Sequence, residues 1–146
     1  MKSLIYLPFA LQGLIMIVDE FHYHKKRGLP LWERIGHPLD TLSVLACYSF
    51  LLFAIPSDLS LGWYFGLCLF SCLFITKDEF VHAKLCAPGE IWLHSLLFIL
   101  HPITLFLAGY VWIHQTDFLF IQAQTAILAI FLLYQSLYWS FYGRNQ

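Results

Sequence analysis

The sequence predicts an all-α integral membrane protein with five transmembrane helices. Of its 146 residues, 60% are hydrophobic, 18% are aromatic and only 12% are charged, and the mean hydropathy is +0.69. Soluble domains carry about 25% charged residues. A helix needs about 20 consecutive apolar residues to cross the hydrocarbon core of a bilayer, and polar interruptions divide the chain into five such stretches. We therefore expect a single transmembrane domain over residues 1–146.

Glycine and proline residues mark the expected ends of these helices. Gly28 and Pro30 end the first stretch, Pro56 follows the second, and Pro88 and Gly89 follow the third. Both residue types interrupt helices because of their backbone conformations. The expected helices cover about 3–24, 31–55, 59–84, 90–113 and 117–142.

Basic residues gather on one side of the expected bundle. Residues 25–27 form a Lys-Lys-Arg run in the first connection, Lys84 lies near the third, and Arg144 lies in the tail, whereas the connections around Asp58 and Gln115 carry no Lys or Arg. Cytoplasmic loops are enriched in Lys and Arg. We therefore expect the N-terminus outside, the C-terminus in the cytoplasm, and the first and third connections at the cytoplasmic face.

An internal repeat organises the first four helices. The order Asp-Glu-Phe, His, Pro, Glu-x-x-x-His occurs at positions 19–37 and again at positions 78–94. Repeats of this length indicate duplicated structural units. We predict two repeated helical hairpins, about 3–55 and 59–113, around a shared metal site, with one additional C-terminal helix at about 117–142.

Ionisable residues are concentrated in the two copies. Of the 16 Asp, Glu and His residues, 13 lie within residues 19–40 and 78–101. Such groups are costly within a membrane, which makes them functional candidates by default. Helical residues three or four apart share a face, so each of the four helices can present one carboxylate and one imidazole at the same depth. The predicted metal ligands are Glu20, His24, Glu33, His37, Glu79, His82, Glu90 and His94.

Two further residues extend these faces about two turns deeper into the bilayer. Asp40 and His101 each lie seven residues beyond a predicted ligand. We predict a catalytic role for both, as groups that tune the ligands or relay protons, and further ligation stays open. The spacing also leaves open whether Asp19, His22 and Asp78 bind metal directly or act on the ligands.

Eight carboxylate and imidazole ligands predict a dinuclear metal centre. Mixed oxygen and nitrogen ligation favours iron, manganese or zinc over calcium and magnesium, and eight ligands exceed what one tetrahedral zinc needs. Two iron ions are our first expectation. The arrangement is similar in its logic to ferritin-like di-iron carboxylate bundles, in which two helices contribute a Glu and two contribute Glu-x-x-His. Here the spacing is mostly Glu-x-x-x-His and the number of His is doubled, so no family membership follows.

These ligands predict a di-iron, oxygen-dependent oxidoreductase. A hydroxylase, desaturase or oxidase of this kind would act on a membrane lipid or another apolar small molecule and would receive electrons from a donor protein. Alternatives are a zinc-dependent intramembrane hydrolase and a protein that transports or senses metal ions or protons. A bis-His haem protein is a further alternative that the sequence supports less well. A purely structural ring of Glu–His contacts with Arg34, Lys77 and Lys84 would need no metal.

Other kinds of site find no support in the sequence. No basic run or stripe favours nucleic-acid binding. The four cysteines show no Cys-x-x-Cys spacing, so we expect buried thiols instead of a disulfide framework or a zinc knuckle. The oligomeric state is open, and an oligomer is compatible with the sequence.

Overall fold

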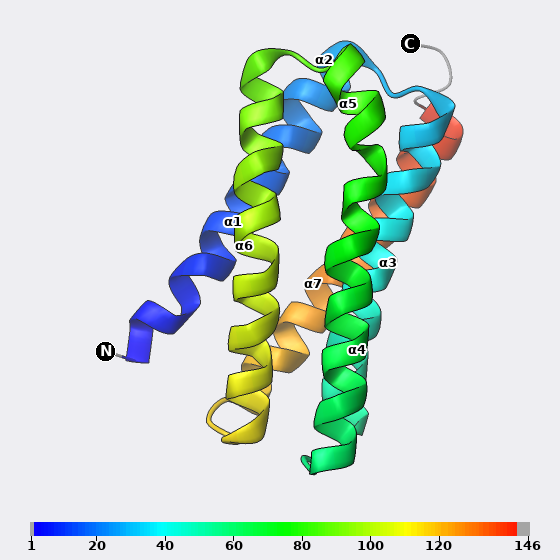
Figure 1. The fold of residues 1–146 in the computed structure, drawn as a ribbon. Coiled ribbons are helices and arrows are strands. Elements are labelled where there is room, and N and C mark those ends of the chain that lie inside the picture. The colour runs from blue at the N-terminus through cyan, green and yellow to red at the C-terminus, as the bar shows by residue number, and fades with distance from the viewer. Residues whose placement is uncertain (1, 143–146) are drawn as a thin grey trace.

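The computed structural model describes residues 2–142, and these residues form an all-helical bundle without strands (Figure 1). In chain order the elements are η1 (Lys2–Tyr6), α1 (Leu7–Val18), η2 (Asp19–His24), α2 (Lys25–Arg27), α3 (Leu31–Phe53), α4 (Asp58–Phe74), η3 (Ile75–Asp78), α5 (Glu79–Leu85), α6 (Pro88–Ile113), α7 (Phe118–Leu137) and η4 (Tyr138–Tyr142). Elements η2 and η4 are π-helical, whereas η1 and η3 are 3₁₀-helical. The all-α prediction is confirmed.

Continuous helical segments within the described chain confirm the predicted number of spans. Five of them are long and apolar enough to cross a membrane, with mean hydropathies from 1.2 to 2.0, as expected of a multi-pass membrane protein. They run over Leu4–Arg27, Leu31–Phe53, Asp58–Leu85, Pro88–Ile113 and Phe118–Phe141.

The connections between the spans use the residues that the sequence singled out. Gly28 ends α2 with a φ of 75°, a region that side chains with a Cβ rarely adopt. Ser57 and Ser60 form a capping box at the start of α4, and Asp117 caps α7 by accepting a hydrogen bond from the Phe120 N–H. The Tyr6 hydroxyl donates to Asp117 at 2.7 Å and lowers the pKa of that carboxyl group.

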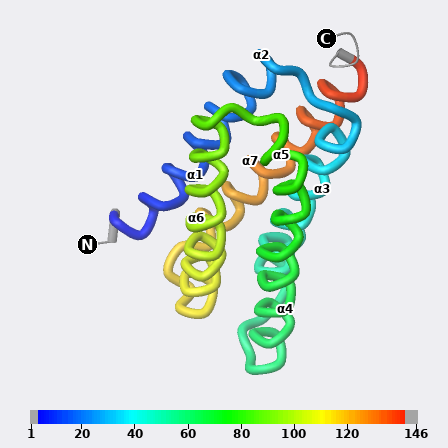
Figure 2. Tube along the Cα trace, turned by 45° about the horizontal axis from the view of Figure 1, so that its top comes forward, coloured from blue at the N-terminus to red at the C-terminus, as the bar shows by residue number. Residues whose placement is uncertain are grey.

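The helices pack in an order that differs from their order in the chain. Helix α1 packs against α6, while α3 lies between α4 and α7. The first and third connections lie at the same end of the bundle as the end of α7, whereas the α3–α4 and α6–α7 connections lie at the other end (Figures 1 and 2). The two repeated hairpins stay a prediction, because this packing does not pair α1 with α3 along their lengths.

The apolar core occupies the end of the bundle away from the first and third connections. Tyr64 of α4 packs against Trp112 of α6, and its hydroxyl donates to the Leu105 carbonyl at 2.6 Å. Gly109 allows this contact, since a Cβ at that position would lie 2.7 Å from the Tyr64 ring. The α4–α6 contact therefore depends on Gly109 having no side chain.

We expect the substitution Gly109→Ala to destabilise the folded protein. Overpacking costs about 1–3 kcal/mol, which exceeds the gain of about 1 kcal/mol from the higher helix propensity of Ala. Gly66→Ala is the matched control, because a Cβ at position 66 meets no atom within 4 Å. Thermal unfolding in detergent should show a lower transition temperature for Gly109→Ala than for Gly66→Ala. Equal transitions would contradict the close approach of α4 and α6.

Candidate metal centre

Most of the ionisable residues of the two sequence copies are buried at the end of the bundle that carries the first and third connections (Figure 1). The most enclosed are His24, Glu33, Asp78 and Glu90, each with at most 1% of its surface exposed. Burial of charged and polar groups costs free energy unless they are paired, hydrogen-bonded or bound to metal. The arrangement of the buried ligand atoms therefore indicates whether pairing, hydrogen bonding or metal binding offsets this cost.

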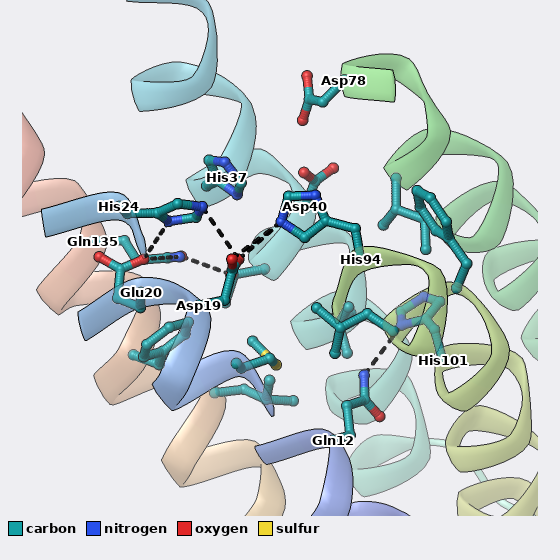
Figure 3. A pocket seen from close by; sticks show the side chains of 18 of the residues that line it. Gln12, Asp19, Glu20, His24, His37, Asp40, Asp78, His94, His101 and Gln135 are labelled. Carbon is teal, nitrogen blue, oxygen red and sulfur yellow. Dashed lines mark hydrogen bonds and ion pairs between the residues drawn. The ribbon is translucent and has the colours of Figure 1, made fainter. Parts of the chain in front are cut away.

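Four of these residues form the first cluster, the Asp19 group: Asp19, His24, Glu90 and His94. Each offers one ligand atom, and the four atoms lie within 4.8 Å of one another. The Asp19 carboxylate lies between two imidazoles, with Oδ2 3.2 Å from His24 Nε2 and 3.1 Å from His94 Nε2 (Figure 3). Element η2, which continues α1, and helix α6 therefore assemble a site that could hold a metal ion.

Three residues form a second cluster, the Glu33 group: Glu33, His37 and His82. Their ligand atoms also lie within 4.8 Å of one another. The two clusters are adjacent, because the ring centroids of His24 and His37 are 4.6 Å apart and those of His82 and His94 are 4.2 Å apart. Four imidazoles, one from each of the first four spans, thus meet in one place.

Several buried atoms of the two clusters lack a hydrogen-bond partner in the described part of the chain. They include Nε2 of His37, both ring nitrogens of His82, Nδ1 of His94 and Oε1 of Glu33. Buried polar atoms are nearly always satisfied, and a site for a bound ion is one established reason for an exception. Imidazole nitrogens and carboxylate oxygens are metal ligands, so their chemistry fits this explanation.

Carboxylates outnumber cations around the two clusters. The carboxylates of this region are Asp19, Glu20, Glu33, Asp40, Asp78 and Glu90. Within residues 2–142, the cations in direct contact with them are Arg27, at 2.7 Å from Glu33 and 2.9 Å from Glu90, and Lys77, at 2.6 Å from Asp40 and 2.7 Å from Asp78. If all six carboxylates are ionised and the imidazoles are neutral, six negative charges against two cations leave an excess of four, which is the charge that two divalent ions would compensate.

The local backbone explains why Asp19 belongs to the site. Regular α-helical spacing predicts that Glu20 and His24 share a face and that Asp19 lies on the flank. Residues 19–24 form a π-helix, in which each turn takes about one residue more than in an α-helix. Asp19 and His24, five residues apart, therefore align, and both are buried.

Glu20 lies behind the Asp19 group and contacts a ligand of that group. Its carboxylate accepts hydrogen bonds from Trp139 Nε1 at 2.7 Å and Gln135 Nε2 at 3.4 Å, and Oε2 lies 3.4 Å from His24 Nδ1. Gln135 in turn accepts a hydrogen bond from Thr41. Glu20 therefore orients the imidazole of His24 from behind, as carboxylates do in many metal sites.

The structure brings six of the eight predicted ligands into the two clusters: His24, Glu33, His37, His82, Glu90 and His94. Glu79 is exposed and lies in neither cluster, and His22 is also exposed. In the second copy, the residues before Glu79 form a 3₁₀-helix, and Asp78 is the buried carboxylate there. Its Oδ2 accepts a hydrogen bond from Lys77.

Cys86 is a candidate ligand that the sequence analysis did not include. Its sulfur, a nitrogen of His82 and a nitrogen of His94 lie within 4.8 Å of one another. The signal was present, because Cys86 follows His82 by four residues and so shares its helix face. Burial and the neighbouring Glu90 carboxylate raise the pKa of the Cys86 thiol to about 12. The thiol is therefore protonated at neutral pH unless a metal ion binds it.

The two deeper residues, Asp40 and His101, lie outside both clusters. They line a cavity of about 130 Å³ that is also lined by Asp19, His24 and His94 of the Asp19 group. Ser71 Oγ lies 3.0 Å from His101 Nε2 and 2.8 Å from Ser43 Oγ, and the Ser43 hydroxyl donates to the Asp40 carbonyl. Ser43 thus accepts from Ser71, and Ser71 accepts from His101. His101 therefore carries its proton on Nε2, while Nδ1 faces the side-chain amide of Gln12 (Figure 3).

No protein-family model, curated protein or solved structure matches this chain. The geometry of the two clusters is therefore the basis for a functional proposal.

We expect Trp139→Phe to weaken metal binding without removing a ligand. The substitution deletes the N–H that Glu20 accepts at 2.7 Å, and losing such an outer hydrogen bond typically lowers metal affinity by about 10–100-fold. Trp92→Phe is the matched control, since Trp92 is 63% exposed. Titration with a chelator should extract metal from Trp139→Phe at a lower concentration than from Trp92→Phe. Identical extraction curves would show that Glu20 does not act through His24.

Proposed function

We propose that this chain is a membrane-embedded di-iron oxidoreductase that acts on a lipid-soluble substrate. The observation that carries the proposal is the contact between the Asp19 group and the Glu33 group, which together offer four imidazoles and three carboxylates. Two adjacent sites of mixed oxygen and nitrogen ligands suit two iron ions of the kind found in di-iron carboxylate proteins. The excess of four negative charges supports two divalent ions over one.

The proposed chemistry is oxygen-dependent oxidation of an apolar molecule. In the hydroxylase form, one atom of O₂ is inserted into a C–H bond and the other leaves as water, with two electrons and two protons supplied by an electron-donor protein and solvent. The iron ions would supply the oxygen activation. The protein supplies the ligands, a largely buried environment and the bridge that Arg27 makes between Glu33 of α3 and Glu90 of α6.

We also propose that the metal centre lies at the cytoplasmic face. Residues 25–27 are Lys, Lys and Arg, and they adjoin the end of the bundle where the two clusters lie. Cytoplasmic loops are enriched in such residues. A soluble electron donor would reach the site from that side.

We expect purified protein to contain close to two iron ions per chain. Elemental analysis of detergent-extracted protein measures this directly. His94→Ala removes a ligand of the Asp19 group and Glu33→Ala removes one of the Glu33 group, so both variants should lose most of the bound metal. Glu79→Ala should retain it, because Glu79 is exposed and lies in neither cluster.

Other results would favour other functions. One zinc ion per chain, lost in Cys86→Ser as well as in His94→Ala, would indicate a mononuclear site built on His82, Cys86 and His94 and would support the hydrolase alternative. Metal retained in both His94→Ala and Glu33→Ala would contradict the assignment of the clusters.

We expect the chemically reduced protein to consume oxygen and its metal-depleted form to do so no faster than buffer. An oxygen electrode measures the rate, and restoring iron to the depleted protein should restore it. His94→Ala should match the depleted protein, while Glu79→Ala should match the unsubstituted chain. Metal-loaded, reduced protein that consumes no oxygen would argue for transport, storage or sensing.

A further inference from the structure

The first span, Leu4–Arg27, and α7 contact each other near both ends but leave a window between their middle parts. At one end, the Phe120 ring lies 4.8 Å from the rings of both Tyr6 and Phe9. At the other, the Phe21 and Tyr134 rings are 5.4 Å apart. The facing stretches between these contacts, about 12–17 of α1 and 124–131 of α7, line a cavity of about 190 Å³.

The rim of this window is apolar and faces outward. Ile17 of α1 is 54% exposed and Ile127 of α7 is 58% exposed, and both line the cavity. Gly13 also lines it, and a Cβ at that position would meet no atom within 4 Å. Both helices are long and apolar enough to span a membrane, and in a bilayer a window between their middle parts would face the hydrocarbon region.

The window adjoins the cavity of the candidate metal centre. The two cavities share five lining residues: Gln12, Met16, Val44, Leu128 and Phe131. Four of the five are apolar, and the amide oxygen of Gln12 accepts a hydrogen bond from Thr104. Beyond them, the inner cavity reaches Asp19, His24 and His94 (Figure 3). Five side chains, four of them apolar, thus separate the window from the cavity that contains the ligand atoms, and a passage between the two forms when these side chains move apart.

We propose that this window admits a long hydrocarbon chain of a membrane lipid to the metal centre. The passage excludes charged or strongly polar molecules, because its shared lining offers one already hydrogen-bonded amide and otherwise apolar surface. Moving from Ile127 to Gln135 along α7 covers about 12 Å at the helical rise of 1.5 Å per residue, so a chain that reaches the metal end from the window extends over about this distance. What happens to the chain at the metal end rests on the proposed function.

Photolabelling tests the window directly. Purified protein in detergent is irradiated with palmitic acid that carries a diazirine on its chain, and separately with a phosphatidylcholine whose acyl chain carries the same group. Labelled peptides are then identified by mass spectrometry. We expect labels on residues 12–17 and 124–131, and the more efficient of the two probes tells whether the chain comes from a free fatty acid or a phospholipid.

The substitution Gly13→Phe should block the window and lower this labelling by about tenfold, since the new ring fills the space beside Ile17. Gly66→Phe is the matched control: position 66 is equally open but lies on α4, away from both cavities. Ile127→Trp narrows the window from the α7 side and serves as a second test if Gly13→Phe does not fold. Gel filtration and metal content establish that each variant is intact.

Labelling that is spread over the lipid-facing surface, or that is unchanged in Gly13→Phe and Ile127→Trp, would overturn the window. The labelling reports on chain binding and needs no metal, so it is repeated after chelation. Window labelling in protein that never contains iron would contradict the proposed di-iron function and support the proposed window. Iron-loaded protein without window labelling would support the proposed di-iron function and contradict the proposed window.

Discussion

Burial of negative charge is the constraint on which this structure depends. Six carboxylates gather at one end of a bundle with little polar surface elsewhere, and Arg27 and Lys77 are the cations within the described chain that contact them. Burial of an unpaired charge strongly destabilises the folded state. The unpartnered imidazole nitrogens beside them complete a set of side chains that could hold metal ions. Bound cations would therefore contribute directly to folding stability, as in other metal-dependent folds.

Departures from regular α-helical geometry decide which carboxylates face this site. The π-helical turn at residues 19–24 aligns Asp19 with His24 and turns Glu20 toward α7. The 3₁₀ turn that ends at Asp78 buries that carboxylate and leaves Glu79 outside. The same sequence motif, Asp-Glu-Phe, thus contributes differently in its two copies, and π-turns are often found at functional sites.

The fifth span supports both parts of the proposal. The sequence predicts α7 as an addition to two hairpins, yet α7 packs along α3 and supplies Gln135, while η4 supplies Trp139 to hold Glu20. With α1 it also frames the window toward the hydrocarbon region. In the proposed function, ligand orientation and substrate access therefore both involve the helix that carries none of the predicted ligands.

The all-helical class, the five helices long enough to span a membrane and six residues of the two clusters could be predicted from the amino-acid sequence. These features follow from hydropathy and from helical spacing such as Glu33 with His37, which are local properties of the chain. Three features could be seen only in the folded chain. Asp19 belongs to a cluster, Glu20 contacts His24 on the side away from Asp19, and Glu79 lies in neither cluster. Those outcomes depend on π and 3₁₀ turns and on contacts with α7, and neither has a periodic signal in the sequence.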